Sequence, residues 1–320
     1  MRIPGTIRVV LSTYYLIILS TLIAPCVYAL DLGFAKQDGG QPGAFLSYGA
    51  GAKALGMGKT FAGVADDASA IYWNPAGLGT LQKREVTALY ASLYENTNYG
   101  FVGYANPLCG NAGTVGIAVV SLNSSGFQMR DIYNYETGEA GLNETAVIIS
   151  YGAVLIRNGA KPRLNAGTSV KAVRQIIDSR SATGYGADAG VLYLASDRLS
   201  VGVSAQNIVA PKLKIGNETD EYPIAVTFGA GYRLLEDRLL IACDVNKTAK
   251  RDYKLHLGGE YRFAKIFSLR AGLDETELAF GAGFRILGYS IDYAFAMHDA
   301  LQGQDGLGGS HRIGFTIKFK

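Results

Sequence analysis

The last hundred residues alternate almost without interruption between apolar and polar or small side chains. From Tyr222 the apolar positions recur at every second residue through Leu234, and the same period returns in each later segment up to Phe319. A period of two puts one kind of side chain on each face of a β-strand. Each segment is about ten residues long, which is the length a tilted strand needs to cross a bilayer. The pattern therefore predicts a transmembrane barrel with an apolar outer face.

From residue 85 onward the chain divides into about fourteen such strands, although short apolar runs such as Val147, Ile148 and Ile149 also fit a buried soluble sheet. The strands are expected near residues 85–95, 97–107, 112–122, 144–156, 163–177, 183–195, 198–207, 222–235, 238–247, 253–263, 265–274, 276–287, 288–298 and 310–319. The predicted fold is an all-β, antiparallel barrel of about fourteen strands with a small helical hatch at its N-terminal end.

The links between these strands alternate in length. Short links lie at residues 196–197, 236–237, 264 and 287–288, and long ones at 123–143, 208–221, 248–252 and 299–309. In an outer-membrane barrel the short turns face the periplasm and the long loops face outward. An even strand count then puts both ends of the barrel in the periplasm.

The first 29 residues differ from the rest, because Arg2 and Arg8 precede an apolar stretch that ends near Ala29. This pattern is typical of a secretory signal peptide cleaved near Ala29. Its removal leaves 28 basic against 27 acidic residues, and no basic cluster carries interleaved aromatic residues, so we expect no binding to nucleic acid. It also leaves two cysteines, Cys109 and Cys243, which we expect to be unpaired.

Residues 30–84 show no strand periodicity and form a separate N-terminal segment. Within it, Asp66 or Asp67 can cap a short helix through Ala70, and Asn74 before Pro75 must end that helix, because a residue before proline avoids the helical region. We therefore predict a capped plug in the barrel. Its key residues are Asp66, Asp67, Ser69, Trp73, Asn74, Pro75, Ala76 and Gly77.

This plug segment, with the glycine-rich stretch 49–58 before it, resembles the N-terminal region of the FadL-like outer-membrane barrels. Tyr72 and Trp73 before Asn74-Pro75-Ala76-Gly77 are most similar to the PorV/PorQ branch, over roughly residues 43–80. The resemblance implies that the Asn-Pro-Ala element lies in a periplasm-side hatch that plugs a fourteen-stranded barrel. It leaves the cargo open, since FadL-like members pass fatty acids or other hydrophobic molecules, whereas PorV-like members serve the type IX secretion system.

The predicted inward positions of the strands divide into two kinds. The late strands carry both signs of charge, which predicts a lumen network of ion pairs among Asp244, Lys254, His256, Glu260, Arg262, Arg270, Arg285 and Asp292. Residues 144–195 instead direct small side chains inward. We predict a cargo-binding wall there at Ile148, Gly167, Ser169 and Gly186, so that Leu at either glycine should impair uptake. A lateral gap is expected at Gly113 and Gly116, because glycine weakens strand packing.

Catalytic motifs are lacking, and no His or Cys spacing suits a metal, so neither enzyme activity nor a cofactor is expected. A barrel hydrolase using one of His256, His298 and His311 with Asp292 or Ser290 is a weak alternative. Three functions remain for a protein embedded in the lipid of the bacterial outer membrane. It is a carrier of hydrophobic small molecules with lateral exit, a docking component for secreted proteins that uses loops 123–143, 208–221 and 299–309, or a purely structural barrel.

Overall fold

The computed structural model describes residues 41–94, 96–264, 266–274, 277–298 and 309–319, all of which belong to one compact unit. The predicted signal peptide and part of the predicted loop 299–309 lie outside the described residues. The strands are β1 (Arg84–Tyr94), β2 (Thr97–Pro107), β3 (Thr114–Arg130), β4 (Glu136–Asn158), β5 (Lys161–Ile177), β6 (Arg180–Leu194), β7 (Leu199–Val209), β8 (Lys212–Ile215), β9 (Glu218–Glu221), β10 (Ala225–Leu234), β11 (Leu239–Thr248), β12 (Tyr253–Phe263), β13 (Phe267–Leu273), β14 (Glu277–Ile286), β15 (Tyr289–His298) and β16 (Gly309–Phe319).

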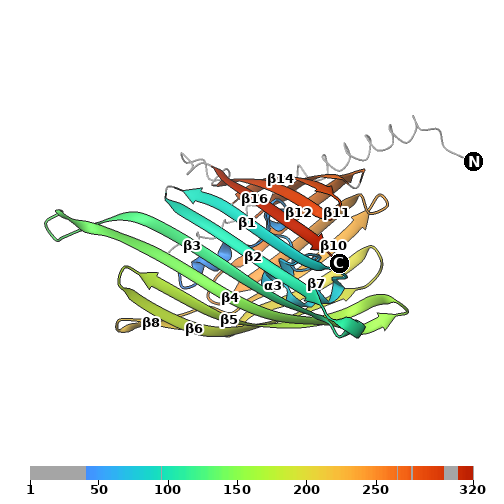
Figure 1. The fold of residues 1–320 in the computed structure, drawn as a ribbon, viewed down its shortest axis with the longest axis horizontal. Helices are drawn as coiled ribbons and strands as arrows, with labels where there is room; N and C mark the ends of the chain where they lie inside the picture. The colour runs from blue at the N-terminus through green and yellow to red at the C-terminus, as the bar shows by residue number, and fades with distance from the viewer. Residues whose placement is uncertain (1–40, 95, 265, 275–276, 299–308, 320) are drawn as a thin grey trace, which may run out of the picture. The chain divides into compact units, whose positions relative to one another are not determined.

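Fourteen of these strands form a closed antiparallel barrel, which confirms the predicted fold class (Figure 1). The order follows the sequence except that β7 pairs with β10, because β8 and β9 form a separate two-stranded sheet. The barrel closes through β1 and β16, where Ala88 lies opposite Phe315. Closure satisfies the backbone hydrogen bonds of both end strands, as a lipid environment requires.

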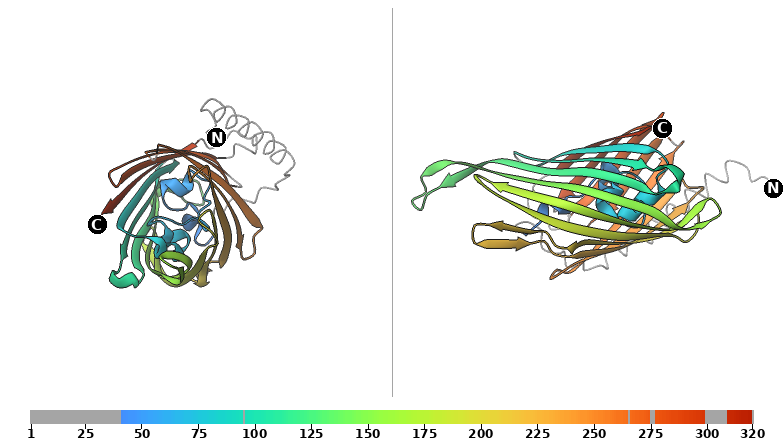
Figure 2. Two further views of the ribbon diagram at one scale, coloured as in Figure 1. Left: turned by 90° about the vertical axis from the view of Figure 1, so that its right-hand side faces the viewer. Right: turned by 60° about the horizontal axis from the view of Figure 1, so that its bottom comes forward.

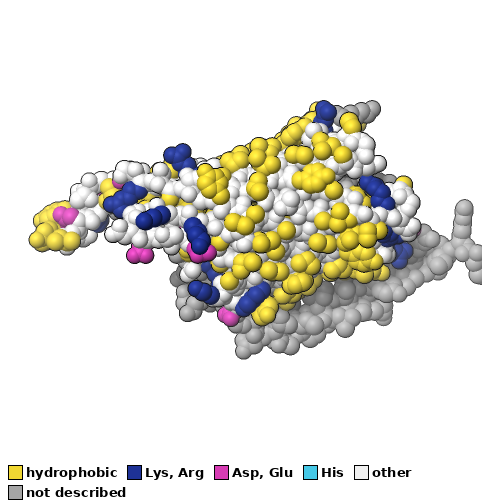
Figure 3. All heavy atoms as spheres, turned by 90° about the horizontal axis from the view of Figure 1, so that it is seen from below, with side chains coloured by type: hydrophobic (Ala, Val, Ile, Leu, Met, Phe, Trp, Pro, Cys, Tyr) yellow, Lys and Arg dark blue, Asp and Glu magenta, His cyan; other side chains and the backbone are white. Residues whose placement is uncertain are grey.

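The period of two fixes which face of each strand points outward. On β3 the exposed side chains are Val115, Ile117 and Val119, while Ala118 and Val120 are buried. Exposed apolar side chains of this kind cover the barrel wall (Figure 3). Tight turns join β6 to β7 and β14 to β15 at the end where β1 begins, which is the end predicted from the sequence to face the periplasm.

The predicted long loop 123–143 is in fact mostly strand. β3 and β4 continue beyond the barrel as a paired hairpin, with Phe127 opposite Ala140 and Arg130 opposite Glu136 (Figure 1). The predicted loop 208–221 likewise contains β8 and β9. Both segments lack the alternating pattern because both faces of a strand outside the membrane contact water, so neither face selects apolar residues.

A hatch, described here from residue 41 to residue 83, fills the lumen (Figure 2). It contains η1 (Ala44–Ser47), α2 (Ala52–Leu55), α3 (Ala70–Trp73) and η2 (Pro75–Thr80), while η3 (Cys109–Asn111) lies outside it between β2 and β3. Its buried apolar side chains, among them Phe45, Leu55 and Phe61, form a core with inward residues of the wall. Among the described residues, no helix is long and apolar enough to cross a membrane.

Candidate functional site: the hatch and the two lumen cavities

The Asn74-Pro75 turn joins the hatch to the wall. Asn74 is fully buried and extended, with φ −156° and ψ 102°, as the following proline requires. Its Oδ1 accepts a hydrogen bond from the Ala76 amide at 3.1 Å, and its Nδ2 donates to the carbonyl oxygens of Ala62 at 2.8 Å and Val191 at 3.2 Å. One side chain thus ties two parts of the hatch to β6.

The other predicted hatch residues lie around this turn. Asp67 Oδ1 accepts hydrogen bonds from the Ser69 amide and hydroxyl at the start of α3. Trp73 Nε1 donates to the Ala50 carbonyl at 2.7 Å, and Gly77 packs against Ala65. A short helix that ends at Asn74 is therefore present, but its N-cap residue is Ser69 and no side-chain hydrogen bond caps it, so the predicted cap by Asp66 or Asp67 is wrong.

Glycines on the inner face of the wall allow the hatch backbone to approach closely. A Cβ at Gly167 would lie 2.3 Å from the carbonyl carbon of Pro75, and one at Gly202 would lie 2.0 Å from the Ala62 oxygen. The same holds on the opposite side, where a Cβ at Gly272 would lie 2.1 Å from the carbonyl carbon of Met57. Sequence reasoning identified small inward residues but missed that the hatch itself occupies the space beside them.

This placement corrects the predicted cargo-binding wall. Gly167 contacts Pro75, and Gly186 faces Pro211, whose Cγ would lie 2.7 Å from an added Cβ. Ser169 is buried and shares a 2.7 Å hydrogen bond with Ser150. Of the four residues, Ile148 lines the larger cavity described below. The expected effect of Leu at Gly167 therefore changes from blocked uptake to displacement of the hatch.

Charged wall residues also hold the hatch. Asp244 Oδ2 accepts hydrogen bonds from the amides of Phe61 at 2.9 Å and Ala62 at 2.8 Å. His256 Nδ1 lies 3.1 Å from the Gly58 carbonyl oxygen. These two members of the predicted lumen network therefore contact the hatch. Ion pairs between strands do exist nearby, since Arg270 of β13 lies 2.7 Å from both Glu260 of β12 and Asp292 of β15. Within β12, Arg262 lies 3.2 Å from Glu260.

The remaining two network residues lie elsewhere. Lys254 lines the larger cavity described below. Arg285 has an inward register opposite Ser290, but it is exposed at the periplasmic rim and has no ion pair among the described residues. The prediction that Arg285 belongs to the ion-pair network is therefore wrong. Its side chain lies at the rim, beyond the hatch, where no buried carboxylate that the structure describes pairs with it.

Two lysines of the hatch, Lys53 and Lys59, form ion pairs inside the barrel. Lys53 Nζ lies 2.5 Å from Asp66 Oδ1. Burial alone would raise the pKa of Asp66, but the neighbouring ammonium lowers it to about 2. Lys59 Nζ lies 2.7 Å from Asp274 and 3.5 Å from Glu277. Burial would lower the pKa of Lys59, yet these carboxylates raise it above its ordinary value. Both hatch lysines therefore remain charged inside the barrel.

Above the hatch, toward the outer end, lies a cavity of about 670 Å³. Its lining combines aromatic hatch side chains, including Tyr48, Tyr72 and Trp73, with charged wall residues such as Lys171 and Asp188. Lys171 Nζ lies 2.7 Å from Asp188 Oδ1 in a buried pair. The cavity is thus lined by aromatic and charged side chains, whereas the sequence predicted a wall of small side chains.

No gap exists at Gly113 and Gly116. The β3 ladder is continuous from Thr114 to Ser124 with both neighbours, and Gly116 faces Ile71 and Leu78 of the hatch. The wall is instead interrupted between β6 and β7, where the pair Ala189–Ala205 is followed by Ala187–Val209. Three residues of β7 oppose one residue of β6 at this bulge.

Asn207 stabilises the interruption. It has a left-handed φ of 58°, its amide donates to Asp188 Oδ1 at 2.7 Å, and its Nδ2 donates to the Pro223 carbonyl at 2.8 Å. The adjacent Gln206 donates to the Tyr72 carbonyl of the hatch at 2.8 Å. The break in the wall therefore borders the larger cavity and contacts the hatch.

Within the described part of the chain, no group of His, Cys, Asp or Glu side chains could hold a metal ion. Cys109 and Cys243 are both free. The site therefore consists of a tightly held hatch, an amphipathic cavity and an interrupted wall.

A fourteen-stranded barrel filled by an Asn-Pro-Ala hatch defines a hatch-plugged transmembrane β-barrel. The family model of the type IX secretion system membrane protein PorP/SprF matches residues 72–317, which is more than half of the chain, so the chain belongs to this family. The match does not confirm the PorV/PorQ branch suggested by the Tyr-Trp motif. No curated protein matches the sequence.

Three solved structures resemble the fold over most of the chain. They are the toluene transporter TbuX of Ralstonia pickettii (TM-score 0.65, 16% identity, covering 85% of this chain and 99% of that one), the toluene transporter TodX of Pseudomonas putida (0.61, 13%, 84% and 97%) and a FadL homologue of Pseudomonas aeruginosa (0.57, 13%, 84% and 95%). At these identities the likeness shows the fold alone.

Proposed function

We propose that this protein is a non-enzymatic docking component of the type IX secretion system, anchored in the outer membrane by a plugged barrel. The observation that carries this proposal is the β3–β4 hairpin, which projects from the outer end of the barrel (Figure 2). Its tip exposes Ile132, Tyr133 and Tyr135, with 91%, 75% and 71% of their surface accessible. Exposed apolar and aromatic side chains at one place are typical of an interaction site.

The position of the tip favours a protein partner over lipid. The outward apolar band on β3 ends near Val119, and Ile132 lies thirteen residues further along the chain. At about 3.3 Å per residue the tip lies roughly 40 Å along the hairpin from that band. A partner for these side chains is therefore an extracellular molecule, such as a secreted protein.

A pair of matched substitutions tests the proposal in a deletion strain that is complemented with variants. Ile132→Ser, combined with Tyr133→Ser, should reduce the amount of type IX cargo reaching its destination by at least about tenfold, as expected for loss of interface anchors. Leu287→Ser is the control, because Leu287 is also 91% exposed but lies in a periplasmic turn. Normal secretion by the hairpin variant, at normal barrel levels, would contradict the docking role.

A carrier of hydrophobic small molecules is the second candidate. The cavity of about 670 Å³ and the adjacent β6–β7 break favour it, because together they provide a binding space and a lateral route. Uptake of a labelled long-chain fatty acid by the deletion strain should then rise when the protein is restored. Ile148→Trp should fill the cavity and lower uptake, whereas Val147→Trp, on the lipid-facing side of the same strand, should not.

A further inference from the structure

The periplasmic mouth of the barrel is lined mostly by basic side chains. Among the described residues, six on five different strands face inward or line the mouth at this end: Lys161, Arg163, Arg233, Arg262, Arg285 and Lys318. Arg198 and Arg238 lie in neighbouring turns. They outnumber the acidic groups at the same level, which are Asp66, Glu85, Asp197, Glu236, Asp237 and Glu260.

Some of this charge is already neutralised and some is not. Lys318 lies 2.7 Å from Glu85, and Arg262 lies 3.2 Å from Glu260. The side chains of Arg233 and Arg285 have no hydrogen bond or ion pair with any residue that the structure describes. The mouth therefore keeps an excess of positive charge that a partner can use.

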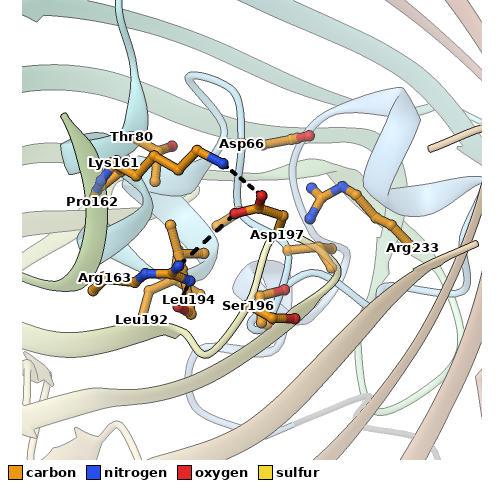
Figure 4. A pocket seen from close by; sticks show the side chains of 14 residues that line it. Asp66, Thr80, Lys161, Pro162, Arg163, Leu192, Leu194, Ser196, Asp197 and Arg233 are labelled. Atoms are coloured by element: carbon orange, nitrogen blue, oxygen red, sulfur yellow. Dashed lines mark hydrogen bonds and ion pairs between the residues drawn. The ribbon is translucent and has the colours of Figure 1, made fainter. Parts of the chain in front are cut away.

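A second cavity, of about 230 Å³, lies at one side of this mouth between the hatch and the wall (Figure 4). Lys161 Nζ is 2.5 Å from Asp197 Oδ2, and Arg163 NH2 is 4.0 Å from Asp197 Oδ1. Arg233 enters from the opposite side, next to Asp66 (Figure 4). The Asp197 side chain is 64% exposed, so it shows how a carboxylate binds at this cavity without being part of the protein core.

The outer end of the barrel has a different charge pattern. Acidic and basic side chains are mixed there, whereas the opposite end of the face in Figure 3 shows Lys and Arg without neighbouring Asp or Glu. On the face shown in Figure 3, the cations without neighbouring Asp or Glu therefore lie at one end of the molecule.

The direction of these side chains favours a soluble partner over membrane lipid. Arg262 lies opposite Ser268, and Arg285 opposite Ser290, and both serines face the lumen. Phospholipid headgroups lie around the outside of a barrel, while these cations surround its opening. We propose that the periplasmic mouth binds an Asp- and Glu-rich peptide segment of a periplasmic protein, with its carboxylates held by Lys161, Arg163 and Arg233.

A fluorescent ten-residue peptide rich in glutamate tests this with the full chain in phosphatidylcholine nanodiscs. The wild type should bind the peptide but not a lysine-rich peptide, and its affinity should fall steeply between about 0.05 M and about 0.5 M salt. Lys161→Gln with Arg233→Gln and Arg285→Gln should weaken binding by at least about tenfold. Arg180→Gln with Lys214→Gln and Lys250→Gln removes the same charge at the outer end and should leave binding unchanged.

A second variant gives an effect of opposite sign. Asp197→Asn removes the carboxylate that competes for Lys161 and Arg163, so it should tighten peptide binding several-fold. Because Asp197 is exposed, this change should not disturb folding. Equal binding by wild type and both triple variants, or weaker binding by Asp197→Asn, would overturn the proposal. A different outcome would identify a lipid site and would also overturn the proposal. In that case the wild type would retain phosphatidylglycerol, the mouth triple variant would lose it, and peptide binding would be the same in both.

Discussion

The two halves of the lumen wall hold the same hatch by partly different physical means. On β4 to β7, glycines such as Gly167 and Gly202 allow the hatch backbone to lie directly against the strands. On β11 and β12, Asp244 and His256 reach out and form hydrogen bonds with hatch main-chain groups. Close packing at glycines therefore occurs on both sides, since Gly272 of β13 also contacts Met57, and the polar side chains of β11 and β12 add hydrogen bonds on one of them.

This difference shows that a small inward side chain does not by itself indicate an open lumen. An inward glycine can border an empty channel or lie in contact with another segment of backbone. An added methyl group is tolerated in the first case and clashes in the second. Charged inward residues likewise divide into those that pair across strands, such as Arg270, and those that bind the hatch, such as Asp244.

The largest expected effect is that of Gly167→Ala. Its Cβ would lie 2.3 Å from the Pro75 carbonyl carbon, so the hatch must move. We expect destabilisation of the hatch by about 3 kcal/mol, the upper end of the range for overpacking. The protein has a single tryptophan, Trp73, so its fluorescence reports hatch unfolding in a denaturant titration.

Gly259→Ala is the matched control for this substitution. Gly259 faces outward, and an added Cβ would meet only the Leu240 oxygen at 3.6 Å. Alanine in a strand is ordinarily better than glycine by about 0.5–1 kcal/mol, so the control should be neutral or slightly stabilising. Similar losses for both variants would mean that glycine flexibility, and not contact with the hatch, sets the effect.

The barrel and the hatch helix were predictable because each depends on a local pattern. A period of two assigns every strand an inner and an outer face, and Asn74 before Pro75 fixes the end of α3. The occupant of the lumen was not predictable, since periodicity identifies the face of Gly167 but not what lies beside it. The β6–β7 break was also missed, because it depends on Asn207 bonding to Asp188 and Pro223, which are distant in sequence.

Asp244→Ala tests the polar half of the wall and should have an intermediate effect. It leaves the buried amides of Phe61 and Ala62 without their acceptor, which should cost about 2 kcal/mol. Asp244→Asn keeps one acceptor oxygen and should cost about half as much. Hydrogen exchange at these two amides measures the loss, and unchanged protection in Asp244→Ala would show that packing on the glycine side holds the hatch alone.

Acidification should have the smallest effect, through the Lys53–Asp66 pair. The pKa of Asp66 is about 2 in the folded protein, below its ordinary 3.8. The pair therefore stabilises the hatch fully above about pH 4, and this contribution is lost as the pH falls through 2. Because the Asp66 side chain is 37% exposed, the effect should remain below about 1 kcal/mol. Trp73 fluorescence, followed from about pH 5 to about pH 2, measures this loss of hatch stability. Asp66→Asn should remove this part of the pH dependence. An identical pH profile in Asp66→Asn would assign the change to other carboxylates, and the hatch would then be held by the wall rather than by its own ion pair.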